Sequence, residues 1–236
     1  MRIEIWSDVV CPWCYIGKRR LESALSTFEH ADQVEVVWRS YQLDPSAPAV
    51  ATETSTQMLA RTYGQSPEGV AGMQQQVSAA AAEEGLVYRL DQTLHVNTVD
   101  AHRLLHLALH EGGPELQGRL KEALLAAYFT QGRNVADHTV LAEVADQAGL
   151  EATGVAEVLA SQRYADEVAA DVAQARAYGA TGVPFFVVDA AYGVSGAQPA
   201  EAFTQVLQRA WRDGHPSIEM VSTGDGDVCG PDGCPV

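Results

Sequence analysis

Basic residues are scarce in this chain of 236 residues. Only 15 Lys and Arg face 31 Asp and Glu, so the formal net charge at pH 7 is −16. Nucleic acids and anionic membrane surfaces are bound by clusters of basic side chains, and the sequence contains no such cluster. It also contains no run approaching the roughly eighteen apolar residues of a membrane-spanning helix. We therefore expect neither a nucleic-acid partner nor a membrane partner.

A secretory signal peptide is a further missing feature. Met1 leads directly into a short strand pattern, with no basic segment, apolar segment or cleavage site before it. We therefore expect a cytoplasmic protein. In a reducing compartment, a closely spaced cysteine pair is more often catalytic, redox-sensing or metal-binding than structural.

Cysteines are few, and all four fall into two short-spaced pairs, a C-x-x-C at residues 11–14 and a C-x4-C at residues 229–234. Alternating β-branched residues predict a strand over 2–6, and apolar spacing predicts a helix over 17–30. Cys11 is thus expected where a strand passes into the first turn of a helix. Unpaired N–H groups and the helix dipole at that place favour a thiolate, so we expect a lowered pKa for Cys11.

The first pair suits thiol-disulfide exchange. A Cys11 thiolate would attack a partner disulfide, and Cys14, one turn later, would resolve the mixed disulfide. Pro12 is compatible with this geometry, because proline is tolerated at the first helical position. Two alternatives remain open, namely one half of a zinc site, which would need two further ligands, and a pair of reduced buried cysteines.

The chain has strand patterns at its two ends and helical periodicity between them. A second strand is predicted over 34–43, and strand patterns return over 181–189 and 192–195 before a final helix that begins at Pro199. The order β-α-β, helical block, β-β-α predicts an α/β thioredoxin-like fold with a large inserted all-helical domain. The predicted domains are a discontinuous thioredoxin-like domain (1–44 and 180–213), a helical insertion (45–179) and a flexible C-terminal tail (214–236). The helices predicted in the insertion are 55–63, 67–84, 99–111, 114–130, 138–148, 154–161 and 164–178.

Three histidines, His102, His106 and His110, lie at i, i+4 and i+8 on one predicted helix. This spacing can present imidazoles to a metal, with Asp100, Glu111 or Asp137 as further ligands, or it can line a packed helix face. Histidines at helical spacing are a weak signal compared with a complete ligand motif, so we expect no metal there.

Four segments together carry a family resemblance. They are DVVCPWCYIG at 8–17, AHRL at 101–104, GVPFF at 182–186 and VSGAQP at 194–199. In this order they resemble the DsbA family of thiol-disulfide oxidoreductases, and its FrnE-like branch in particular, over most of residues 1–213. The resemblance implies a thioredoxin fold with an inserted helical domain, and an oxidoreductase or isomerase that acts on protein or small-molecule thiols and disulfides as a monomer or a homodimer.

The resemblance also implies roles for individual residues. Cys11 would be the nucleophile, Cys14 the resolving thiol, and Pro184 a cis-proline facing them, although a proline before a strand can also be a trans structural stop. The backbone of Val183 would then pair with an extended substrate beside Pro12 and Trp13. No cofactor is implied beyond the redox-active disulfide, with glutathione as a conceivable co-substrate.

One departure concerns the residues between the cysteines. The best-known family members have histidine there, whereas this chain has Trp13, whose indole cannot donate a charge-assisted hydrogen bond to a thiolate. A less stabilised thiolate means a less oxidising disulfide. The sequence therefore leaves open whether the protein oxidises, reduces or isomerises its partners.

The second pair lies in a segment rich in Gly, Asp and Pro. Cys229 and Cys234 flank residues that fit a type I turn, which would bring the two thiols together. FrnE-like proteins have a similar extra pair. Our hypothesis is that this auxiliary redox pair relays electrons or disulfides to and from the first pair, and the alternative is a local disulfide.

Two other functions fit parts of the sequence. The kappa-type glutathione transferases and the hydroxychromene-carboxylate isomerases share the fold, use glutathione and act on small aromatics, but usually place serine where Cys11 stands. A non-enzyme alternative is a zinc site formed by all four cysteines, Cys11, Cys14, Cys229 and Cys234.

Overall fold

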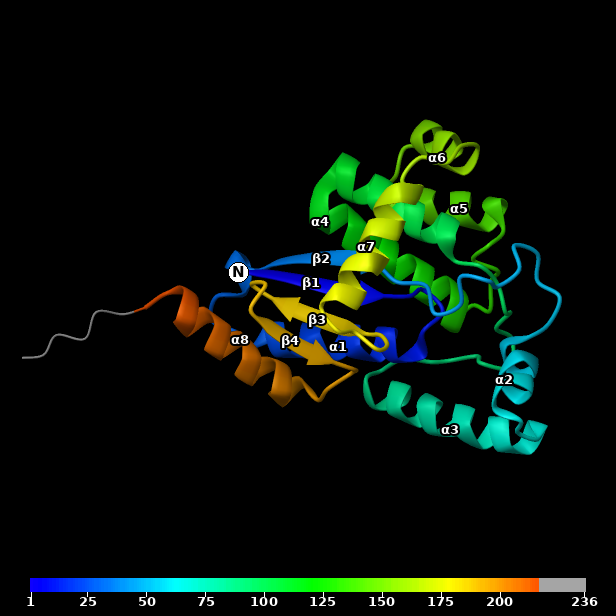
Figure 1. Ribbon diagram of the computed structural model, residues 1–236, viewed down its shortest axis with the longest axis horizontal. Helices are drawn as coiled ribbons and strands as arrows, with labels where there is room; N and C mark the ends of the chain where they lie inside the picture. The colour runs from blue at the N-terminus through cyan, green and yellow to red at the C-terminus, as the bar shows by residue number, and fades with distance from the viewer. Residues whose placement is uncertain (217–236) are drawn as a thin grey trace, which may run out of the picture.

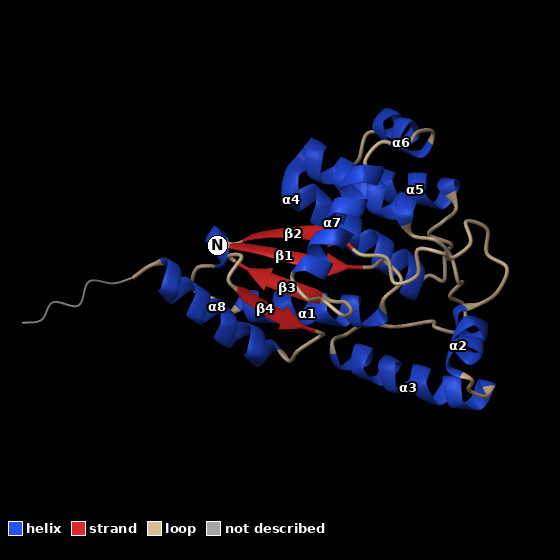
Figure 2. Cartoon of the chain, viewed as in Figure 1, coloured by secondary structure: helices blue, strands red, loops and turns tan. Residues whose placement is uncertain are grey.

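Four strands form one mixed sheet in the order β2-β1-β3-β4 (Figures 1 and 2). The structure is a computed structural model that describes residues 1–216. β1 (Arg2–Ser7) runs parallel to β2 (Glu35–Ser40) and antiparallel to β3 (Phe185–Val188), which pairs in turn with antiparallel β4 (Tyr192–Ser195). The α/β thioredoxin-like fold class predicted from the element order is therefore confirmed.

Helices α1 (Pro12–Ser26) and α8 (Ala200–Gly214) cover one face of the sheet (Figure 1). Side chains alternate along a strand, so Ile3 and Ile5 of β1 point toward these helices, together with Phe186 of β3. Each fully buried side chain of this size contributes about 1.5–3 kcal/mol to folding. The sheet and its two helices therefore share one apolar core.

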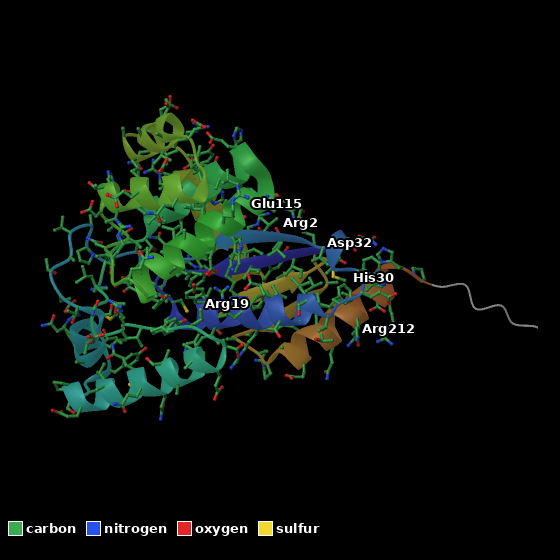
Figure 3. The ribbon with its side chains drawn as sticks, turned by 180° about the vertical axis from the view of Figure 1, so that it is seen from behind. Arg2, Arg19, His30, Asp32, Glu115 and Arg212 are labelled. Atoms are coloured by element: carbon green, nitrogen blue, oxygen red, sulfur yellow. The ribbon has the colours of Figure 1, made fainter. Side chains whose placement is uncertain are left out.

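The far end of α8 is held by an aromatic stack. The ring of Trp211 lies between the imidazoles of His30 and His215, with ring centroids 4.0 and 3.8 Å away. His30 precedes the short 3-10 helix η1 (Ala31–Gln33) and lies beside the end of α8 in Figure 3. The stack thus fixes α8 to the turn between α1 and β2.

The second face is covered by α4 (Val99–Phe129) and α7 (Ala165–Ala177), which pack against the sheet on the side opposite α1 and α8 (Figure 2). Trp6 is fully buried there, and its indole N–H donates to the Asp171 carbonyl at 2.7 Å. The Gln117 carboxamide of α4 accepts from the backbone N–H of Trp38 at 2.9 Å and donates to its carbonyl at 2.8 Å. Gln117 therefore occupies hydrogen-bonding groups of β2 that an exposed edge would offer to another strand.

The segment between β2 and β3 is helical, as predicted. Its apolar core also includes Val9, Tyr15 and Ile16 from the region around the first cysteine pair, so it is continuous with the sheet domain. The predicted domain boundaries stay a prediction. Besides α4 and α7, the helices are α2 (Ser55–Tyr63), α3 (Pro67–Glu83), α5 (His138–Ala148) and α6 (Ala152–Leu159).

Two glycines divide α4. Gly112 and Gly113 leave helical geometry, and Gly113 has a φ of 67°, in the left-handed region that favours glycine. Pro114, which follows, starts the second half of the helix. The two helices predicted over 99–111 and 114–130 are therefore the two halves of one kinked element.

Some predicted bounds were wrong. The first helix begins at Pro12 rather than at residue 17, because proline serves as its first residue, and it ends at Ser26 rather than at residue 30. β3 begins at Phe185 rather than at residue 181, since Pro184 before it has no N–H to donate to a ladder. β2 ends at Ser40, three residues earlier than predicted.

Gly17 permits the close approach of α1 to the chain before β3. A Cβ at this position would lie 3.0 Å from Pro184 Cγ and 3.2 Å from Phe186 Cζ. Replacing glycine by alanine in a helix normally stabilises it by up to about 1 kcal/mol, but here the rigid proline ring opposes the added methyl group. We expect Gly17→Ala to be about 1–2 kcal/mol less stable than the matched variant Gly72→Ala, whose Cβ meets nothing within 4 Å. Urea unfolding of both variants measures this difference, and equal stabilities would contradict it.

Candidate active site

The antiparallel register of β1 and β3 brings the predicted site residues together. Trp6 lies opposite Phe185, so the chain leaving β1 and the chain entering β3 meet at the same end of the sheet. The Val183–Pro184 peptide bond is cis, and the Sγ atom of Cys11 lies 3.5 Å from the carbonyl oxygen of Val183. Two segments that are far apart in sequence thus form one site.

Cys11 is the residue immediately before helix α1, as the sequence pattern predicts. Both thiols of the pair are free and almost fully buried, with Cys11 3% and Cys14 1% exposed. Cys11 lines a cavity of about 360 Å³, together with Pro12, Trp13 and Val183, whereas Cys14 lies outside the cavity wall. A ligand in the cavity therefore meets the Cys11 sulfur first.

A buried carboxylate lies three residues before the cysteine pair. Asp8 accepts hydrogen bonds from the backbone N–H groups of Val9 at 2.7 Å and Leu43 at 2.8 Å, and from His102 Nε2 at 3.2 Å. Burial would raise the pKa of Asp8, but the hydrogen bond and charge of His102 and the Leu43 amide lower it overall. Asp8 is thus held ionised, and it joins the loops after β1 and β2 to helix α4.

A buried ammonium group balances this carboxylate. Lys121 of α4 has no exposed surface, its Nζ donates to the Ser7 carbonyl at 3.4 Å, and it lies 5.4 Å from the centre of the Trp38 ring. Burial lowers the pKa of Lys121 to about 8, although the nearby Cys14 and Asp8 favour its charged form. The amine therefore carries its charge at neutral pH and loses it at mildly alkaline pH.

The protonation of each thiol depends on the other. The interaction with Cys14, followed by burial, raises the pKa of Cys11 well above its usual value. Burial would also raise the pKa of Cys14, but the hydrogen bond with Cys11, the Lys121 charge and the Ser7 hydroxyl lower it overall. The expectation of a lowered pKa for Cys11 is therefore wrong, because its interaction with Cys14 and its burial outweigh the position before the helix.

Two of the three histidines of α4 face carboxylates from other elements, and the third packs beside an aromatic ring. His102 bonds Asp8, and His106 Nε2 lies 3.2 Å from Ser40 Oγ and 3.0 Å from Asp171 Oδ2. His110 packs beside the Tyr164 ring.

Within residues 1–216, no group of three or more His, Cys, Asp or Glu is placed to hold a metal ion. Cys229 and Cys234 lie outside the described residues, and so does any zinc site or relay that needs them.

Sequence reasoning missed several contacts around the pair. The Tyr88 hydroxyl donates to the Pro12 carbonyl at 2.7 Å. Arg20 donates both to the Glu84 carboxylate at 2.6 Å and to the Ala197 carbonyl at 2.7 Å, so it links the two residues. Lys121 had no local signal, since the same buried helix face also carries Gln117. The contacts of Tyr88 and Arg20 depend on tertiary structure and have no local pattern.

Lys121→Met should raise the pH at which the first thiolate of the pair forms, because the substitution removes the ammonium that stabilises it. At pH 7, alkylation of the reduced pair should slow several-fold, and the thiolate absorbance should rise only at higher pH. Lys18→Met is the matched control, because Lys18 is also buried but pairs instead with Glu22 and Glu122. Identical pH profiles for wild type and Lys121→Met would show that the lysine does not act on the thiols.

Two distant relatives share the fold. A cytosolic disulfide reductase, DsbM, from Pseudomonas aeruginosa, solved with GSH, has a TM-score of 0.63 at 15% identity, covering 90% of this chain and 100% of its own. A 2-hydroxychromene-2-carboxylate isomerase has a TM-score of 0.64 at 12% identity, covering 91% of this chain and 98% of its own. At these identities the likeness shows the fold alone.

Among residues 1–216, no helix combines the length and apolar character needed to cross a membrane.

Two closer comparisons identify the family. A probable DsbA oxidoreductase from Streptomyces coelicolor is 49% identical, with a TM-score of 0.85, and the alignment covers 100% of this chain and 99% of that chain. The model of the DSBA-like thioredoxin domain matches residues 2–208. The chain therefore belongs to the DSBA-like thioredoxin domain family of thiol-disulfide oxidoreductases, as the order of its motifs predicts.

Proposed function

We propose that this protein exchanges disulfides with its partners through Cys11 and Cys14, by way of a mixed disulfide. The observation that carries the proposal is the unequal placement of two free thiols, since Cys11 lines a cavity and Cys14 lies behind it. A nucleophile must be reachable by the substrate, whereas a resolving thiol needs to reach only the nucleophile. Pro184 precedes β3, and the carbonyl of the residue before it contacts Cys11, so Pro184 completes the proposed catalytic set.

The chemistry conserves atoms and electrons. In the singly ionised pair, the proton of Cys11 passes to the Cys14 thiolate, and the Cys11 thiolate attacks one sulfur of a substrate disulfide, which releases the other sulfur as a thiolate. Cys14 then gives its proton to that released thiolate and attacks the Cys11 sulfur, so the second substrate sulfur leaves as a thiolate and the enzyme becomes the disulfide. The substrate gains two electrons, and the reverse sequence oxidises a dithiol. If another thiolate of the substrate attacks the mixed disulfide before Cys14 does, a new substrate disulfide forms and Cys11 leaves as a thiolate, so the substrate's disulfides are rearranged.

The backbone beside the cysteines is the proposed binding surface. Pro12, Trp13 and Val183 border the same cavity as Cys11, and Trp13 is 41% exposed there. An extended substrate would pair with the Val183 backbone while Trp13 packs against the residue beside its cysteine. We further propose a cytosolic location and protein or small-molecule disulfides as partners, which is supported by the likeness to a reductase described as cytosolic.

The auxiliary pair, Cys229 and Cys234, is proposed to relay electrons or disulfides to and from the first pair. Fourteen residues separate the end of α8 from Cys229. Fully extended, these fourteen residues would span at most about 46–50 Å. The 15-residue α8 is only ~22 Å long, so a segment of this reach could extend back along the whole helix and beyond it. This reach supports an exchange between Cys229 or Cys234 and the first pair.

Cys14→Ser should stop the proposed reaction halfway. With a disulfide-bonded peptide, this variant should accumulate a mixed disulfide at Cys11 and lose turnover by at least about 100-fold, because no resolving thiol is present. Cys11→Ser should form no adduct at all, and mass spectrometry of both proteins distinguishes the outcomes. A Cys14→Ser protein that still turns over a small aromatic substrate with glutathione would favour the glutathione-dependent transferase or isomerase alternative.

The paired substitution Cys229→Ser and Cys234→Ser should slow multiple turnovers by a few-fold while a single exchange at Cys11 keeps its rate. The expected difference arises because a relay acts only in regenerating the first pair. A comparison of single-turnover with steady-state rates checks the relay. A zinc assay on protein purified without chelator checks the four-thiolate site. Unchanged steady-state rates would contradict the relay, and about one bound zinc per chain would support the metal alternative.

A further inference from the structure

The cavity beside Cys11 has an apolar wall supplied by the insertion. Met58 and Tyr63 come from α2, and Met73 comes from α3. Four apolar side chains around it are exposed, namely Trp13 at 41%, Leu43 at 50%, Tyr63 at 59% and Met73 at 41%. Methionine side chains adapt to ligands of different shape. The wall is therefore suited to one bulky apolar group placed next to the reactive sulfur.

The exposed side of the cavity is acidic. Among the described residues that line the cavity, none is Lys or Arg, whereas Asp44 is a half-exposed carboxylate; the other carboxylate, Asp8, is buried and balanced by Lys121. His95, which also lines it, is held between Asp44 Oδ2 at 2.9 Å and Glu53 Oε1 at 3.1 Å, so a proton on this imidazole would already be neutralised. Within the described part of the wall, no cationic side chain remains to receive an anionic group.

We propose that this cavity selects disulfide-bonded peptides that place a bulky apolar residue, and no negative charge, beside the cysteine attacked by Cys11. The proposal rests on the proposed function and names its substrate class. Burying an apolar side chain against Met58 and Met73 supplies binding energy, and the carboxylates favour neutral or basic neighbours. Glutathione disulfide carries four carboxylates, and their desolvation beside Asp44 without a cationic partner is unfavourable.

The experiment measures exchange rates of the reduced, full-length protein with matched disulfide peptides. The probes differ at one position beside the cysteine, with Phe, Ala, Lys or Glu, and glutathione disulfide is the fifth probe. We expect the Phe peptide to react about tenfold or more faster than the Ala peptide, because a Phe side chain buries more apolar area against the wall than an Ala side chain. The Lys peptide should react several-fold faster than the Glu peptide, with a difference that shrinks as salt is added.

Substitutions at Met73 test the wall itself. Met73→Glu should slow the Phe peptide about tenfold, and Met73→Lys should speed glutathione disulfide several-fold, because it supplies the missing cation. Met73→Leu should keep wild-type selectivity. Val87→Glu and Val87→Lys are matched charge controls, since Val87 is 67% exposed on the insertion but does not line the cavity, and their selectivity should be unchanged.

The outcomes separate the two proposals. If the wild-type protein exchanges with none of the five probes, the proposed function itself fails. If all five react at similar rates, or glutathione disulfide reacts fastest, the protein is an oxidoreductase and the proposed selectivity is wrong. A change at Val87 equal to that at Met73 would also overturn the assignment, because the effect would then come from overall charge and not from the cavity.

Discussion

The carboxylate of Asp8 is the contact on which the geometry of the site depends. It receives the backbone amides that follow β1 and β2 and the imidazole of His102, so three separate elements meet at one buried charge. Each hydrogen bond to a charged group contributes about 1.5–3 kcal/mol, and a buried carboxylate without such partners would be strongly unfavourable. The position of the loop that carries Cys11 is therefore set together with the position of α4.

This arrangement makes the insertion part of the chemistry. Lys121 enters from α4 with no exposed surface, and its ammonium favours a thiolate on Cys14. Tyr15 of α1 donates to Glu122 at 2.6 Å, and Arg19, labelled in Figure 3, pairs with the same carboxylate, so α1 is fixed to the helix that carries the lysine. The sheet positions the two sulfurs, and the insertion supplies both the charge beneath them and the wall beside them.

Much of the fold could be predicted from sequence because its signals are local. Alternation along residues 2–6, glycines between helices and the proline after Cys11 each depend on a few neighbouring residues, and they were enough to predict the order of elements. The bounds of α1 and β3 were wrong where a proline decides the end of an element. Lys121 and Asp8 could not be placed, because a buried charge is recognised only from partners such as Ser7, Leu43 and His102, which lie far away in sequence.

The thiol that a ligand meets is not the thiol that best holds the negative charge. Cys11 borders the cavity but has its pKa raised by its neighbour, whereas Cys14 has its pKa lowered behind it. In the proposed reaction, Cys11 would attack a substrate disulfide after its proton has moved to Cys14. When the inner thiol must later attack in turn, it loses that proton beside a lysine that still favours its thiolate. In the proposed reaction, the buried cation would thus assist the second attack, in which Cys14 resolves the mixed disulfide.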